Sequence, residues 1–237
     1  SSVQGFKARI FWIFWALASL FLIIWFGRRA AFFSLLLGCS PLLWFSSPKT
    51  KIVILLLTIF ALVGVALSLR TPSGKRLWLR SDKIKLILTG KRELWARAGS
   101  LGQRLYIWPL YFREALKHPF KGTGLARRVQ KRVLKDLNEK ALRLEHTHNL
   151  FLNLWLQAGL LPVIFFLIFY GYTLKYALKL AKLGNSTGIY WGGFLIAFLF
   201  MSLFEGLEEW TRFTPFWIAS ALIWGTSEGS SLSRPSA

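Results

Sequence analysis

The sequence predicts an all-α integral membrane protein, a polytopic helical bundle with one large, basic, helical periplasmic loop. Three observations favour this fold. Apolar residues make up 54% of the 237 residues and form unbroken runs, without the alternation with polar residues that a soluble domain shows. Several runs approach the ~20 residues that a helix needs to cross about 30 Å of hydrocarbon. The net charge of +21 is concentrated largely in one segment.

Six apolar runs are candidate spans, each expected to be helical because a segment in lipid must satisfy its own backbone hydrogen bonds. They are Ile10–Phe26, Ala30–Phe45, Ile52–Leu69, Leu150–Tyr172, Tyr190–Phe204 and the short Phe213–Trp224. Pro41 should kink the second run and Pro162 the fourth. The chain then divides into three spans in 1–69, a basic loop in 70–148, two to three spans in 149–226 and a cytoplasmic Ser-rich tail in 227–237.

Basic residues in the short segments set the expected orientation. Clusters before the first span, between the second and third, and after the fourth all fall on one side, which is therefore cytoplasmic. The segment Arg70–His148 is then periplasmic despite its 20 Lys and Arg against 6 Asp and Glu, since long loops translocate largely regardless of charge. Arg28 and Arg29 oppose the trend in a short outer loop. They either extend to lipid headgroups or have a function at the membrane edge.

Helical pieces are expected within the large loop. The segment Gln103–Lys117 is typical of an amphipathic helix, ended by His118-Pro119 and a turn at Gly122-Thr123-Gly124. A second helix, with one apolar stripe, is expected between Val129 and Leu144. Arg104 lies at the start of the first of these helices, where the helix dipole disfavours a cation, so a bound anion is indicated there.

The charge balance also limits the partners. An excess of 31 Lys and Arg over 10 Asp and Glu calls for an anionic partner. No nucleic-acid recognition module is present, so no nucleic-acid partner is expected. In a membrane protein the remaining candidates are anionic membrane lipids, phosphorylated glycolipids and pyrophosphate-linked lipids.

Polar residues that could carry chemistry gather where the loop meets the fourth run, at His146-Thr147-His148-Asn149. Histidine is a suitable general base for a sugar hydroxyl near neutral pH. Two other interpretations remain open. The residues could simply begin a helix, with Asn149 near its start. They could also bind zinc, for which His118 or Glu145 would have to supply a third ligand.

Three motifs, in order along the chain, resemble those of the O-antigen ligase and polymerase superfamily. Gly27–Ala31 is similar to the family's "SRGA" signature, with Arg29 matching the arginine while Arg28 and Ala30 depart from it. Gly102–Trp108 followed by Ala115–Gly124 resembles an "R…W" helix that leads into an "HP…G.G" turn. His146–Asn153 with Ala158–Leu160 resembles the pattern "H.HN…L…GL".

The resemblance implies a multi-pass protein of the bacterial inner membrane with a large periplasmic loop. Such enzymes move a glycan from undecaprenyl pyrophosphate to an acceptor, with neither a metal nor another cofactor. Carried over, Arg29 and Arg104 would bind the pyrophosphate and His148 would activate the acceptor hydroxyl. Arg28, His146 and Asn149 are possible accessory residues. The family usually has more spans ahead of the arginine motif, so the chain resembles a C-terminal portion.

Among these functions the sequence favours an O-antigen ligase, whose acceptor is lipid A–core. The basic loop favours a phosphorylated core as acceptor, since that core is more anionic than a repeat unit. The alternative within the superfamily is an O-antigen or exopolysaccharide polymerase, which extends another glycan. A non-catalytic membrane subunit that binds anionic glycolipid would also explain the charge, but not the histidine.

Overall fold

The computed structural model describes residues 17–23, 29–78, 81–95, 97–124, 147–204 and 210–232. Within these residues all regular secondary structure is helical, as the sequence predicts. In this described part of the chain, three helices are long and apolar enough to cross a membrane, namely α4 (Pro48–Ser68), α11 (Leu160–Lys182) and α12 (Ser186–Phe204). Most of the first predicted span and the helix predicted between Val129 and Leu144 lie outside the described residues.

The second apolar run forms two short helices, α2 (Arg29–Gly38) and α3 (Ser40–Phe45). The break falls at Cys39, and Pro41 occupies the first turn of α3, where its missing N–H is tolerated. The run is therefore interrupted two residues before Pro41, close to the predicted kink. The chain then turns at Ser47, whose hydroxyl accepts a hydrogen bond from the Thr50 N–H and so caps α4.

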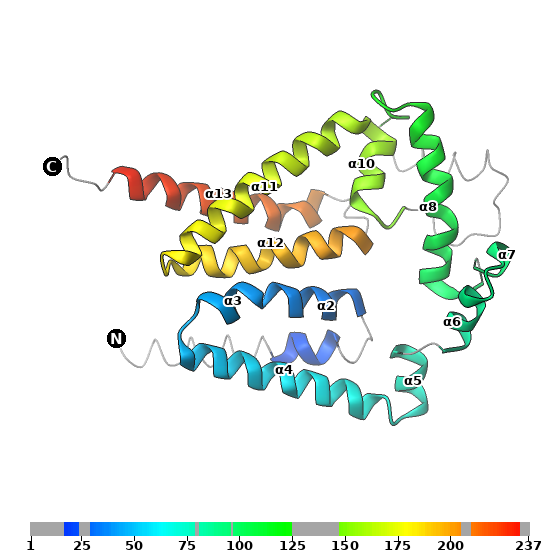
Figure 1. Cartoon of the computed structure of the whole chain (residues 1–237), viewed down its shortest axis with the longest axis horizontal. Helices are drawn as coiled ribbons and strands as arrows, with labels where there is room; N and C mark the ends of the chain where they lie inside the picture. The colour runs from blue at the N-terminus through cyan, green and yellow to red at the C-terminus, as the bar shows by residue number, and fades with distance from the viewer. Residues whose placement is uncertain are drawn as a thin grey trace.

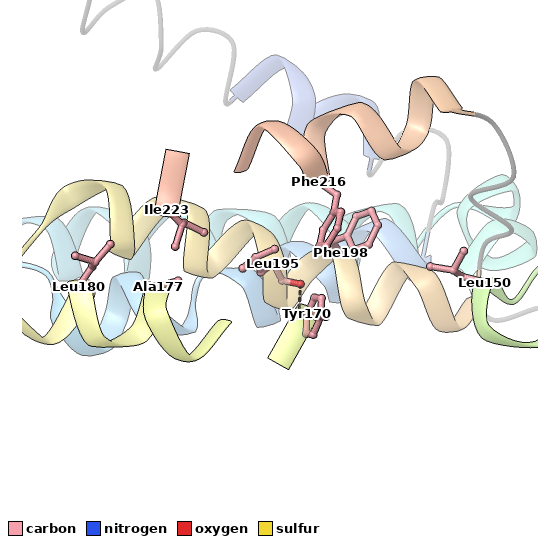
Figure 2. Close-up of a cluster of buried hydrophobic side chains, with 8 residues drawn as sticks. All are labelled: Leu150, Tyr170, Ala177, Leu180, Leu195, Phe198, Phe216 and Ile223. Atoms are coloured by element: carbon pink, nitrogen blue, oxygen red, sulfur yellow. Dashed lines mark hydrogen bonds between the residues drawn. The ribbon is translucent and has the colours of Figure 1, made fainter. Parts of the chain in front are cut away.

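The main core lies between α11, α12 and α13 (Trp210–Leu232), as Figure 2 shows. The Tyr170 hydroxyl of α11 donates a 2.7 Å hydrogen bond to the Leu195 carbonyl of α12. From α13, the fully buried Phe216 stacks on both Tyr170 and Phe198. The short run predicted at Phe213–Trp224 is thus part of a longer helix, which continues to Leu232 into the predicted tail.

Helix α12 is central to the bundle because it packs on α2 and α3 as well as on α10 (Leu150–Ala158), α11 and α13 (Figure 1). Two glycines permit the close approach of α2. A Cβ on Gly193 would collide with the carbonyl oxygen of Gly38, and a Cβ on Gly38 would lie 2.9 Å from that of Gly193. Small residues at helix crossings let membrane helices approach backbone to backbone. Helices from both ends of the chain are therefore packed directly together.

The prediction that Leu150–Tyr172 forms one continuous span is wrong. The chain forms α10 (Leu150–Ala158), breaks at Gly159 and continues as α11, which runs in a different direction (Figure 1). Gly159 has φ of +89°, a left-handed conformation that favours glycine and ends the first helix. Pro162 falls in the first turn of α11, where proline is tolerated, so the break comes from the glycine and not from the proline predicted to kink this run.

Between α4 and the turn that follows residue 118, the described residues form four helices. They are α5 (Pro72–Trp78), α6 (Ser81–Leu88), α7 (Arg92–Trp95) and α8 (Gly99–Lys117). The predicted helix Gln103–Lys117 is present as α8 and begins four residues earlier than expected. Helix α8 packs on α6 and α7 near its start and on α10 along its length, where Ile107, Tyr111 and Leu156 are fully buried.

Candidate functional site

The turn after α8 closes over the end of α10. Its Thr123 N–H and hydroxyl both donate to the Leu156 carbonyl, at 2.7 and 2.8 Å. The Gly124 N–H donates to the Gln157 carbonyl at 3.0 Å. The last carbonyls of a helix have no partner within it. The predicted "HP…G.G" turn therefore exists, and it caps the helix that begins after His148.

Two glycines make this contact possible. Gly122 has φ of +64°, and a Cβ there would collide with the Gln157 carbonyl oxygen. A Cβ on Gly159 would likewise meet the carbonyl oxygen of Phe120. In return, the Leu160 N–H donates to the Pro119 carbonyl at 2.7 Å. The glycines of two separate sequence motifs thus interlock backbone to backbone.

A tryptophan on α8 holds the other end of α10. The Trp108 indole N–H donates to the Thr147 carbonyl at 2.7 Å. Thr147 is completely buried, and its hydroxyl donates to the Asn149 carbonyl at 3.0 Å. The "R…W" motif is therefore joined directly to the "H.HN" motif. Sequence reasoning missed this role of Trp108, although a half-buried indole N–H usually bonds to an acceptor.

Asn149 is the N-cap of α10. Its side-chain oxygen accepts a hydrogen bond from the Leu152 N–H at 2.9 Å, and its amide nitrogen donates to the Leu203 carbonyl of α12 at 3.2 Å. The prediction of a helix start at this residue is confirmed. Asn149 also connects the motif to the C-terminal end of the central helix.

His148 lies between these two anchored residues. Its φ of +48° is the only positive value at a non-glycine residue in the described part of the chain. Left-handed backbone is uncommon for such residues and costs free energy, and it often occurs at functional sites. The side chain is half-buried. His146 lies outside the described residues, so its relation to His148 stays a prediction.

Arg104 lies one helical turn before Trp108 on α8, so the two side chains share a face of the helix. Its Nε atom is buried. Contrary to the prediction, the helix dipole does not disfavour a cation at this residue. Because α8 begins at Gly99, Arg104 is in the second turn, beyond the first turn in which the dipole acts.

Arg29 begins α2 and lines a pocket together with Lys83 of α6 and with Ser100 and Leu101 of α8. Ser100 is one turn before Arg104, so Arg29 lies near the start of the helix that carries Arg104 and Trp108. From Ser100 to Trp108 the helix rises about 12 Å at 1.5 Å per residue. The three motifs therefore meet along one helix. Arg28 lies outside the described residues.

The zinc interpretation gains no support from His118. It follows the last residue of α8, ten residues beyond Trp108, which is about 15 Å along the helix. In the described ranges no three His, Cys, Asp or Glu side chains are grouped as metal ligands would be. Glu145, the other possible third ligand, lies outside those ranges.

The family model described as O-antigen ligase (Wzy_C) matches residues 13–168, more than half of the chain. The match includes α2, α8 and α10 with Arg29, Arg104 and His148, and it ends within α11. Comparison with curated proteins gives no match. On the family match, the chain belongs to the O-antigen ligase family.

Proposed function

We propose that this protein is an O-antigen ligase-type glycosyltransferase, which transfers a glycan from undecaprenyl pyrophosphate to lipid A–core. Family membership supports a membrane glycosyltransferase of the ligase or polymerase type. One observation carries the assignment of residues. The hydrogen bond from Trp108 to Thr147 joins the residue before His148 to the helix that bears Arg104.

In the proposed reaction the acceptor hydroxyl attacks the anomeric carbon of the donor glycan. His148 takes the hydroxyl proton as the new carbon–oxygen bond forms. The bond between the anomeric carbon and the pyrophosphate oxygen breaks, and undecaprenyl pyrophosphate leaves with the electron pair. The proton then passes from His148 to water. Each of these steps uses groups that this chain, its substrates or the surrounding water supply.

Arg29 and Arg104 have the chemistry needed for the leaving group. A guanidinium can donate two parallel hydrogen bonds to a phosphate and stays charged, so it stabilises the negative charge that develops as the bond breaks. Both arginines lie near the first two turns of α8. A diphosphate bound there would extend toward the region of His148.

The basic segment 70–148 has a place in the same scheme. We assign it to the periplasm and the spans to the bacterial inner membrane, because the lipid-linked glycan and the core acceptor meet on that side. Its 20 Lys and Arg against 6 Asp and Glu attract phosphorylated lipids and raise their local concentration.

The lipopolysaccharide banding pattern of cells that lack the gene tests the proposed function. Loss of a ligase leaves core without O-antigen and accumulates lipid-linked polymer. Core that carries a single repeat unit would identify a polymerase instead. Transfer from purified lipid-linked donor to core acceptor should also require the protein. An unchanged banding pattern and no transfer by the purified protein would favour a non-catalytic glycolipid-binding subunit.

A further inference from the structure

A pocket lies where the start of α2, helix α6 and the first turn of α8 meet. Arg29, Lys83 and Ser100 supply its polar lining, and Ile84, Ile87 and Leu101 supply an apolar one. Its enclosed space is only about 10 Å³, close to the volume that one water molecule needs. A ligand would therefore contact this lining at the open surface with one end, such as a headgroup, and the remainder of the ligand would lie outside.

Two cations share this pocket, and none of the described residues that line it is acidic. Lys83 is half-buried and forms no ion pair with a described side chain. An anion in the pocket would be attracted by both side chains. The first amides of α8 also face outward from the helix end, and Ala98 at its N-cap provides no side-chain hydrogen bond to them.

The apolar half of the lining narrows the ligand class. A free phosphate or a sugar phosphate has no apolar group to pack on two isoleucines and a leucine. A lipid phosphate has hydrocarbon directly beside its charge. Ile84 and Ile87 are three residues apart on α6, so they share one face of that helix, and Lys83 adjoins them. The pocket thus matches a phosphate attached to an apolar chain.

We infer that Lys83 is a third phosphate-binding residue, and that this pocket holds a phosphate of the polyprenyl diphosphate donor with its first isoprene units against Ile84, Ile87 and Leu101. The inference rests on the proposed function and extends it, since it assigns Lys83, Ser100 and the α6 surface to donor binding. Arg104, one turn further along α8, is then positioned for the second phosphate.

Binding of farnesyl diphosphate to the purified full chain in nanodiscs tests the inference without requiring transfer. Lys83→Ala should raise the Kd about tenfold, since a hydrogen bond to a charged group is lost. Lys83→Arg, which retains a cation, should restore most of the affinity. Lys85→Ala is the matched control, because Lys85 is exposed on the same helix and does not line the pocket. Its Kd should change less than twofold.

Three results would overturn the inference. They are equal Kd values for the Lys83→Ala and Lys85→Ala variants, farnesol binding as tightly as farnesyl diphosphate, and competition by phosphatidylglycerol at comparable concentration. The last would identify the occupant as an ordinary anionic lipid. The proposed function fails separately. If the protein binds farnesyl diphosphate through Lys83 but transfers no glycan, the inference about the pocket stands and the ligase assignment is wrong.

Discussion

The indole N–H of Trp108 donates a 2.7 Å hydrogen bond to the backbone carbonyl of Thr147, 39 residues later in the chain. Because the indole is a donor only and its direction is set by a rigid ring, this bond determines where the peptide between Thr147 and His148 lies. On the other side of His148, Asn149 is held by α10 and α12. The candidate base is therefore anchored through both neighbours.

Trp108→Phe retains an aromatic ring but removes the N–H donor, so the Thr147 carbonyl loses this hydrogen bond. Such a loss is worth about 1–3 kcal/mol, so glycan transfer should fall on the order of tenfold, through kcat more than through KM for the donor. Trp155→Phe is the control. The Trp155 indole N–H is buried and bonds to no described residue, so its removal should leave transfer unchanged. Equal effects of the two substitutions would contradict the positioning role.

His148→Asn should reduce transfer by about 10²–10⁴ while the protein still accumulates in the membrane. Asparagine tolerates the left-handed backbone found at this residue but cannot act as a base, so the variant separates chemistry from conformation. His118→Asn, at the exposed end of α8, should have little effect. We expect His146→Ala to retain measurable activity. Normal transfer by His148→Asn, with membrane levels checked by immunoblotting, would remove His148 from the mechanism.

Arg29→Lys and Arg104→Lys should each impair transfer although the charge is retained, because lysine cannot reproduce the planar two-point contact with phosphate. Arg113→Lys, exposed on the same helix as Arg104, should be nearly neutral. Steady-state kinetics with the lipid-linked donor gives the comparison. If all three variants behave alike, the basic surface attracts its substrates only by diffuse charge.

Gly122→Ala and Gly159→Ala should each lower the apparent melting temperature of the purified protein. Both place a Cβ against a backbone carbonyl at positive φ, at a cost of about 1–3 kcal/mol. Gly171→Ala provides the reference, because no atom lies within 4 Å of the place its new methyl group would occupy and alanine favours a helix. A melting curve unchanged in all three variants would mean that the interlocked turn contributes little to stability.

Cysteine labelling tests the orientation. In a Cys39→Ala background, a cysteine at Thr89 should react with an impermeant thiol reagent added outside the inner membrane, whereas one at Lys179 should not. Both positions are accessible in the structure, so a difference reports the side of the membrane and not burial. The charge distribution of the short segments motivates the expectation. The reverse labelling would place His148 on the cytoplasmic side and rule out the proposed reaction.

Apolar run length predicted much of the fold, because a spanning segment needs only enough hydrophobic residues in a row. Run length predicted the helices found at Pro48–Ser68 and Ser186–Phe204. It did not predict the break within Leu150–Tyr172, because that break depends on the contact of Gly159 with the Phe120 carbonyl across the interlocked turn. Composition within one run contains no information on that tertiary contact.

The candidate site was likewise predicted only in part from the sequence. The polar motif at His146–Asn149 was visible as residue types, and Asn149 was expected near a helix start, which the structure confirms. The link from Trp108 to Thr147 was not visible, since it joins segments 39 residues apart. Lys83 could not be distinguished from the other basic residues of the loop by sequence. Only its place beside Arg29 in a pocket separates it from them.

The close packing of α2 on α12 at Gly38 and Gly193 affects the order in which the protein assembles in the membrane. Residues near Gly38 emerge from the ribosome some 150 positions before Gly193, the residue on which they pack. Until α12 is inserted, the surface of α2 that packs on it is covered only by lipid or by the insertion machinery. The carbonyl that binds Asn149 belongs to Leu203, so the motif around His148 acquires this anchor only at the same late step. Assembly of the bundle and completion of the candidate site are thus a single event in biogenesis, and a nascent chain stopped before α12 should lack both.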